Sequence, residues 1–197
     1  MARRGNHTLE EIKNMVVTAA EELVLEGGLP QLRVRNIAMK IGYTVGSIYM
    51  VFDNMNDLIL HIKGRSLDSI IEQMEQVKAD GVNQRLAKLA ITYINYAKQN
   101  QNRWSMIFEH HLPESDDVPA WYQQKVDRLY SSFDDEFAYL APELSTQERR
   151  LNALAFLSGL HGLCVFRLTT QLMECNDHDF EESVALLVRK FSPNNGN

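Results

Sequence analysis

Cysteine is scarce in this chain of 197 residues, which contains only Cys164 and Cys175. Two cysteines are too few for a disulfide framework, so a small disulfide-rich secreted protein is not expected and a reducing cytoplasm fits better. The sequence also has no unbroken apolar run near the ~20 residues that a membrane-spanning helix needs. Its first residues, MARRGNHTLEE, are basic but precede no apolar stretch, which argues against a secretory signal. We therefore expect a cytoplasmic protein without a membrane segment.

Motifs for catalysis and metal binding are missing as well. The chain has no nucleophile elbow, no phosphate-binding loop and no zinc-protease pair. Glu109, His110 and His111 are consecutive, and consecutive residues point about 100° apart on a helix, so they cannot converge on one ion unaided. Cys175 and His178 have a spacing typical of metal ligands, but the chain offers no second half for such a site. We expect no enzymatic activity, no cofactor and no metal site.

The period-two alternation of β-strands is also absent, and apolar residues recur instead at spacings of three and four. This pattern predicts an all-α fold. The expected helices cover residues 8–27, 34–40, 45–51, 54–78, 86–97, 103–111, 119–140, 145–173 and 179–191.

Several of these helices begin or end at recognisable capping residues. Thr8 with Glu11 and Ser145 with Glu148 match the capping box, in which each side chain of the pair satisfies a free backbone N–H of the other residue. Gly42 can adopt the left-handed conformation that ends a helix.

Residues 33–52, RVRNIAMKIGYTVGSIYMVF, predict two short helices separated by a turn at Gly42. Ile48 and Phe52 are spaced to anchor the second of these helices on the preceding ones. In a helix-turn-helix the second helix enters the DNA major groove. The charge distribution agrees: residues 1–65 hold eight basic and seven acidic residues, whereas residues 66–197 hold twelve and nineteen. Acidic surface therefore lies mostly outside the expected DNA-reading segment.

The segment IAMKIGYTVGSIYMVFDNMNDLI resembles the signature of tetracycline-repressor-type (TetR family) regulators, commonly close to IAxxAGVSxGTLYxYFxSKEEL. The matching positions are Ile37, Ala38, Gly42, Gly46, Tyr49, Phe52 and Leu58. The later segment LSGLHGLCVF is similar to a His-Gly-containing helix of one subclass of the family.

This resemblance implies a helix-turn-helix DNA-binding domain over residues 8–65 and a ligand-binding and dimerisation domain over residues 66–192. It also implies a homodimer, a double-stranded operator of approximate two-fold symmetry and a small-molecule effector. The small residues Ser158, Gly159 and Gly162 would let the backbones of packed helices approach closely.

Two positions depart from the family pattern. Met55 stands where the family usually has a phosphate-contacting lysine, so that contact is absent or comes from another group. Met50 could contact a thymine methyl group or could simply pack.

The candidate DNA-contacting residues are Arg33, Arg35, Tyr43, Thr44, Val45, Gly46, Ser47, Tyr49 and Met50. Tyr49 and Thr44 can donate hydrogen bonds to phosphate oxygens, unless they are only a half-buried aromatic and a helix cap. Arg33 and Arg35 would add positive charge at a helix N-terminus, unless they are a solvated surface pair.

Base reading then falls to the remaining side chains, Tyr43, Val45, Ser47 and Met50, by elimination. None of them is an Arg, Lys, Asn or Gln with bidentate capacity, so apolar, hydroxyl and shape-based recognition is expected. Arg3 and Arg4 would form either an arm along the DNA or a basic tail.

The candidate effector-binding residues are aromatic or amphipathic side chains of the C-terminal helices: Trp104, Phe108, His111, Trp121, Tyr122 and His161. Aromatic residues at helical spacing also form plain hydrophobic core, which is the alternative for each of them. His161 is a polar residue in a strongly apolar helix. Its imidazole therefore needs a hydrogen-bond partner, either a ligand or a protein carbonyl.

The resulting hypothesis is a homodimeric transcriptional regulator, a repressor, controlled by an apolar or amphipathic small molecule of unknown identity. One alternative is a DNA-binding adaptor of the same fold that recruits a protein and senses no small molecule. The other is a small-molecule-binding or metal-responsive protein that no longer binds DNA.

Overall fold

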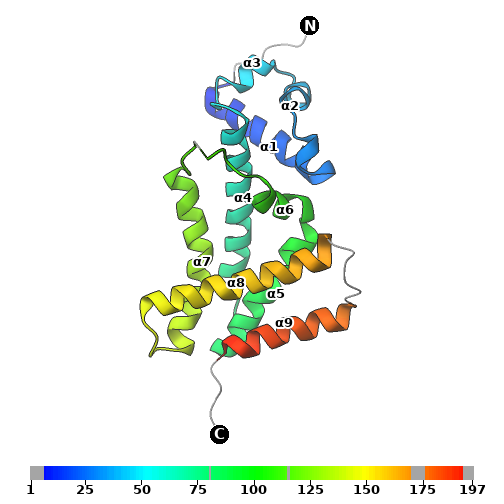
Figure 1. Cartoon of the computed structure of the whole chain (residues 1–197). Coiled ribbons are helices and arrows are strands. Elements are labelled where there is room, and N and C mark those ends of the chain that lie inside the picture. The colour runs from blue at the N-terminus through cyan, green and yellow to red at the C-terminus, as the bar shows by residue number, and fades with distance from the viewer. Residues whose placement is uncertain (1–6, 80, 115, 170–175, 193–197) are drawn as a thin grey trace. The chain divides into compact units, whose positions relative to one another are not determined.

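The computed structural model describes residues 7–79, 81–114, 116–169 and 176–192, and Figure 1 shows the order of the helices. Within these ranges the regular elements are helices, which confirms the all-α prediction. They are α1 (Leu9–Gly27), a 3-10 turn (Leu29–Gln31), α2 (Val34–Ile41), α3 (Val45–Ile48), α4 (Met55–Glu75), α5 (Val82–Gln99), α6 (Gln101–Glu109), α7 (Ala120–Leu140), α8 (Thr146–Thr169) and α9 (Asp177–Phe191).

The chain divides into two compact units. The first unit comprises residues 1–66 and 100–122, and the second comprises residues 67–99 and 123–197. Both α4 and α7 contribute residues to each unit, because the divisions fall inside these helices. These are units of packing. The functional division into residues 8–65 and 66–192 stays a prediction.

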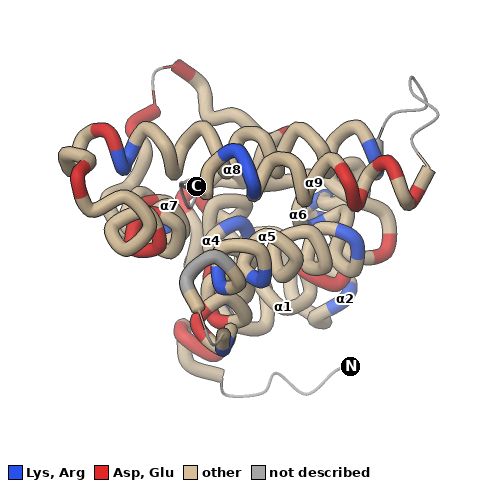
Figure 2. Tube along the Cα trace, turned by 90° about the horizontal axis from the view of Figure 1, so that it is seen from below, with Lys and Arg blue, Asp and Glu red and all other residues tan. Residues whose placement is uncertain are grey.

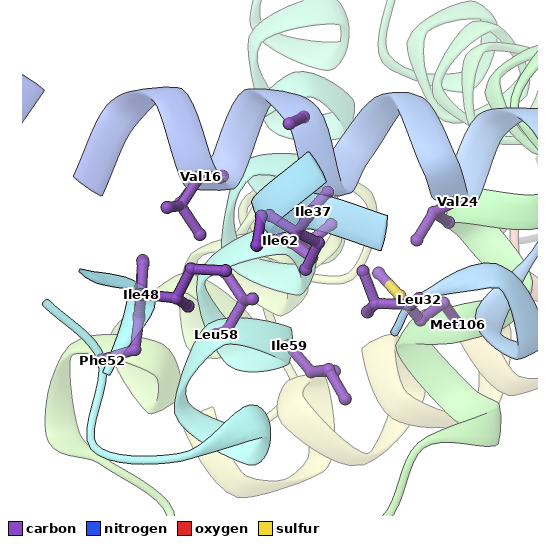
Figure 3. Close-up of a cluster of buried hydrophobic side chains, with 14 residues drawn as sticks. Val16, Val24, Leu32, Ile37, Ile48, Phe52, Leu58, Ile59, Ile62 and Met106 are labelled. Atoms are coloured by element: carbon purple, nitrogen blue, oxygen red, sulfur yellow. The ribbon is translucent and has the colours of Figure 1, made fainter. Parts of the chain in front are cut away.

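The core of the first unit is formed by α1, α2, α3 and the first half of α4, with Met106 of α6. Figure 3 shows Ile37, Ile48, Phe52 and Leu58 among side chains that point toward one another. All four are at most 2% exposed. Each such buried side chain contributes about 1.5–3 kcal/mol relative to an exposed one, so the anchoring predicted for Ile48 and Phe52 is confirmed and strong.

A partly buried ion-pair network joins three helices of the first unit. Glu21 of α1 accepts hydrogen bonds from Arg65 of α4 at 3.1 Å and from Arg103 of α6 at 2.9 Å. Its side chain is 14% exposed. The Arg103 guanidinium also donates to the Ser66 hydroxyl at 3.3 Å. This network connects α6 to the N-terminal helices, although α6 lies far from them in the sequence.

The predicted caps are present. Glu11 and Thr8 form the complete capping box of α1. The Ser145 hydroxyl accepts from the Glu148 amide at 3.3 Å, while the Glu148 carboxylate accepts from the Ser145 amide at 2.8 Å.

Several helices differ in extent from the prediction. Helix α5 begins at Val82 rather than at residue 86, and α6 ends at Glu109, so His110 and His111 lie beyond it. The helix expected over residues 45–51 is α-helical only from Val45 to Ile48. The Val51 amide bonds the Ile48 carbonyl three residues back, which is the tighter 3-10 spacing that commonly ends short helices. Helix α4 ends at Glu75 rather than near residue 78. The end expected for α8, near residue 173, lies outside the described residues.

In the second unit α9 packs against α8 and α5 (Figure 1). Rings of Phe133, Phe137, Phe156 and Phe191 lie 5.4–6.0 Å apart and fill the space between α7, α8 and α9. Gly159 permits the close approach expected of a small residue, because a Cβ there would lie 3.0 Å from Leu187 of α9. A Cβ on Gly162 would meet nothing within 4 Å, so this glycine is not required by the contacts within the chain.

Helix α8 is also long and apolar enough, between Thr146 and Leu168, to cross a membrane by length and composition alone. The sequence shows no unbroken apolar run at this helix, because polar residues are interspersed along it. A core helix of a soluble protein passes the same test, so this feature is weak evidence for a membrane segment.

Candidate DNA interface and effector residues

The turn between α2 and α3 is built on Gly42, whose φ of 72° lies in the left-handed region. Its amide bonds the Met39 carbonyl at 3.3 Å, and the Tyr43 amide bonds the Ala38 carbonyl at 3.0 Å. Thr44 then caps α3, accepting a hydrogen bond from the Ser47 amide at 3.2 Å. This turn reverses the chain sharply, so α3 sits across α2 with Ile48 buried and its opposite side outward.

The outward side of α3 and of the following turn carries the predicted DNA-contacting residues. Met50 is 69% exposed and Tyr49 is 46% exposed. The packing alternative for Met50 is therefore wrong within this chain. Val45 and Ser47 are half-buried, while Thr44 and Gly46 are exposed. A Cβ on Gly46 would meet only the Thr44 hydroxyl, at 3.7 Å, so packing within the protein does not require a glycine here.

Positive charge is unopposed on part of this surface. Residues 33–52 contain Arg33, Arg35 and Lys40 but no carboxylate. Lys40 is neutralised by Glu22 at 3.0 Å and Glu26 at 3.3 Å, and these contacts raise the pKa of Lys40. Both arginines are exposed and have no carboxylate partner in the part of the chain that the structure describes. Arg33 and Arg35 are therefore available to an external anion.

His7 is a residue of this surface that sequence reasoning missed. Its Nδ1 lies 2.7 Å from the Tyr43 hydroxyl, and the two rings are 6.1 Å apart. The histidine thus holds the tyrosine side chain at the turn. A separation of 36 residues in the chain leaves no local pattern that could have revealed this pair.

Met55, the departure at the start of α4, has a packing role. It is half-buried and lies against the core of the first unit. An apolar side chain suits that position. Arg3, Arg4 and Cys175 lie outside the described residues.

Five of the six candidate effector residues belong to the first unit. Trp104 is buried beside Phe108, with ring centroids 5.6 Å apart. Trp121 stacks on His61 of α4 at 4.7 Å and meets Tyr122 edge-on at 5.8 Å. The exposed His111 lies with Nδ1 3.1 Å from the Glu109 carbonyl.

His161, the sixth, lies in the second unit on α8. Its Nδ1 is 3.4 Å from the Tyr93 hydroxyl of α5, and burial lowers the pKa of the imidazole. The structure therefore does not gather the six candidates within one unit. A separate groove of about 540 Å³ lies between α5 and α9 in the second unit and is lined by Ile91, Ile94, Lys98, Val184, Val188 and Arg189, among others.

Comparison with known proteins adds two family matches. Residues 16–62 match the family of bacterial regulatory proteins called tetR, and residues 86–191 match the tetracyclin repressor-like C-terminal domain. The fatty acid metabolism regulator protein of Bacillus subtilis is 33% identical over 61 residues, 31% of each chain. The transcriptional repressor KstR2 of Rhodococcus jostii is 28% identical over 132 residues, which are 67% of this chain and 57% of that one.

A solved structure shares the fold over nearly the whole length. The transcriptional regulator FadR of Bacillus subtilis, in complex with stearoyl-CoA, superposes with a TM-score of 0.66 at 17% identity, covering 91% of this chain and 97% of that one.

Proposed function

This chain belongs to the tetracycline-repressor family of DNA-binding transcriptional regulators, and we propose that it is a ligand-controlled repressor. It binds a two-fold symmetric operator as a homodimer and is released by an apolar or amphipathic small molecule. The observation that carries this proposal is the reading surface of α2 and α3, which is exposed, contains no carboxylate and is anchored from behind by Ile37, Ile48 and Phe52.

On this surface the residues have separate roles. Arg33 and Arg35 bind phosphates, and Thr44 and Tyr49 donate hydroxyl hydrogen bonds to the same backbone. Gly46, without a side chain, lets the backbone of α3 approach the groove.

Recognition of sequence rests on Tyr43, Val45, Ser47 and Met50. The exposed Met50 offers an apolar contact to a thymine methyl group. His7 holds Tyr43 in place for its contact.

A second copy of the chain covers the exposed face of α8 and α9. Residues 151–166 of α8 include no Asp, Glu, Lys or Arg, and the middle of this helix is accordingly tan in Figure 2. Leu151, Leu154 and Phe166 of α8 and Leu186 of α9 are each 45–56% exposed. A contiguous apolar face on a monomer marks an interface, and a two-fold dimer uses the same face of both copies. The dimer then presents two reading heads, which meet successive major grooves when they are about 34–36 Å apart.

For the effector, the first probe is a long-chain acyl compound, because one relative is named for fatty acid metabolism and one structural neighbour contains stearoyl-CoA. The proposed contacts are the candidates of the first unit, Trp104, Phe108, His111, Trp121 and Tyr122, and His161 of the second unit is not proposed as a contact of the same ligand. The ligand controls DNA binding only if it favours one spacing of the reading heads over another.

The test begins with selection of bound DNA from a random pool, followed by titration of the selected DNA with stearoyl-CoA. An inverted-repeat sequence is expected, and Arg35→Ala should weaken its binding. Recovery of no enriched sequence would contradict the proposal.

The dimer is tested separately by sedimentation. Leu154→Asp should give a monomer, whereas Leu25→Asp, an equally exposed leucine on α1, should leave the dimer intact. A monomeric wild-type protein would refute the homodimer.

A further inference from the structure

Lys63 of α4 is a buried cation without an opposite charge. Its relative exposure is 6%, and no carboxylate of the described residues pairs with it. The Nζ donates to the His110 carbonyl at 3.0 Å and lies 5.5 Å from the centroid of the Tyr122 ring. A lysine ammonium has three N–H donors, and lysine is almost never buried unless it is paired. The Lys63 ammonium therefore has N–H donors beyond the one that bonds the His110 carbonyl.

Next to Lys63, the imidazole of His110 has one ring nitrogen whose hydrogen-bonding capacity is unused. Its Nε2 lies 3.0 Å from Oδ1 of Asn56, an oxygen that can only accept, so Nε2 carries the proton. The opposite nitrogen, Nδ1, is buried and has no hydrogen-bond partner among the described residues. A buried polar atom without a partner costs about 1–3 kcal/mol and calls for an explanation.

The local electrostatics are positive. Burial, then the charges of Lys63 and His111, lower the pKa of His110. Burial also lowers the pKa of Lys63 to about 8, which still leaves the ammonium largely protonated at neutral pH. An anion beside the ammonium would accept a hydrogen bond from it, and its negative charge would favour a second proton on the imidazole, at Nδ1, which could then also donate to the anion.

We propose that Lys63 and His110 bind the anionic group, a carboxylate or a phosphate, of the small-molecule effector. This rests on the proposed ligand control and identifies the chemistry of the site. Tyr122 supplies an aromatic wall next to the cation, and Trp121 meets the Tyr122 ring edge-on. His110 is also the first residue after α6, at the start of a segment with several exposed residues.

The position of this site links it to the DNA-reading helices through α4. Asn56, in the first turn of α4, holds His110. His61 packs edge-on against Phe52 at 5.4 Å on one side and stacks on Trp121 on the other. An anion that repositions Lys63 and His110 therefore acts on the helix that follows the reader directly. The coupling runs within the first unit.

The experiment measures binding of stearate, stearoyl-CoA and stearyl alcohol to the full chain, by calorimetry and by tryptophan fluorescence. The variant is Lys63→Met, which keeps an unbranched side chain one atom shorter and removes the charge. Removing one partner of a buried charge pair costs about 2–5 kcal/mol, so the Kd of an anionic probe should rise about 30-fold or more. The affinity for stearyl alcohol should not change. Loss of stearate binding identifies a carboxylate, and loss of stearoyl-CoA binding alone identifies a phosphate.

Two matched lysines serve as comparisons. Lys13 lies 5.3 Å from the Phe52 ring in the same unit, and Lys13→Met should leave every Kd unchanged. Lys98 lies 5.2 Å from the Phe180 ring and lines the groove between α5 and α9. If Lys98→Met weakens the anions and Lys63→Met does not, the anion binds in that groove and the inference is wrong.

A second variant guards against indirect effects. His110→Phe keeps a ring but removes Nδ1 together with the Nε2 hydrogen bond to Asn56, and it should weaken the anionic probes about tenfold or more. Unchanged affinity in both Lys63→Met and His110→Phe, or binding of neither anion to the wild type, overturns the inference. If stearoyl-CoA releases DNA from wild type and Lys63→Met alike, the site is refuted while ligand control stands.

Discussion

The burial of Lys63 predicts a pH-dependent stability that can be measured without any ligand. Burial lowers the pKa of this lysine from 10.5 to about 8 in the folded protein. Below pH 8 the ammonium is charged in both states, so the folded state bears the full cost of desolvating it. Above pH 10.5 the amine is neutral in both states and the cost is absent. The contribution of Lys63 to the free energy of unfolding therefore rises with pH between these two values.

The magnitude follows from the same two pKa values. Their difference, 10.5 minus about 8, corresponds to about 3 kcal/mol at 1.36 kcal/mol for each tenfold change in proton affinity. Lys63→Met removes the titrating amine and with it the cost of burying a charge. It also removes the hydrogen bond to the His110 carbonyl, which is worth about 1 kcal/mol. The variant should thus be more stable than wild type by about 2 kcal/mol at neutral pH, and this advantage should disappear and reverse by pH 11.

The assay is urea unfolding of both proteins from about pH 7 to about pH 11, at one fixed protein concentration because dimers gain stability by mass action. The difference between the two proteins cancels the titration of all other groups. Lys13→Met is the control and should show no comparable dependence on pH. A difference between Lys63→Met and wild type that stays constant across this range would show that Lys63 is not buried as a charge.

Three further substitutions test the reading surface and the core. Tyr49→Phe should weaken DNA binding by about 1 kcal/mol on all sequences, the typical value of one net hydrogen bond, and unchanged affinity in a gel-shift titration would exclude the phosphate contact. Glu21→Gln should lower the free energy of unfolding by about 2 kcal/mol, because two partly buried arginines lose their shared carboxylate, whereas the exposed neighbour Glu22→Gln should cost less than about 1 kcal/mol. Gly42→Ala should cost about 1 kcal/mol through backbone strain alone, since a Cβ there meets nothing within 4 Å, and a thermal unfolding curve identical to wild type would contradict the left-handed turn.

The departures from the family pattern acquire separate explanations. Met55 belongs to the packing of the first unit, where a charged side chain would be poorly placed. Met50 faces outward, so its side chain is available for the proposed contact with DNA. In the proposed interface the charged phosphate contacts then come from Arg33 and Arg35, with which no described carboxylate forms an ion pair.

The features that could be predicted from the sequence are those that local interactions create. The helices, the capping boxes at Thr8 and Ser145 and the left-handed turn at Gly42 each depend on residues within about four positions, and spacing reports such contacts directly. Ile48 and Phe52 could likewise be placed in the core from their helical spacing alone. These features sufficed to predict the helix-turn-helix.

Contacts between segments far apart in the chain became apparent only in the folded protein. Residues 100–122 join the N-terminal helices, and this places five of the six candidate effector residues in the first unit and His161 in the second. Lys63 and His110 are 47 positions apart, and His7 and Tyr43 are 36 apart. Helical periodicity states that a side chain faces inward but not what it meets there. A lysine on α4 could have been solvated, and its burial without a carboxylate results from packing between segments that no short pattern connects.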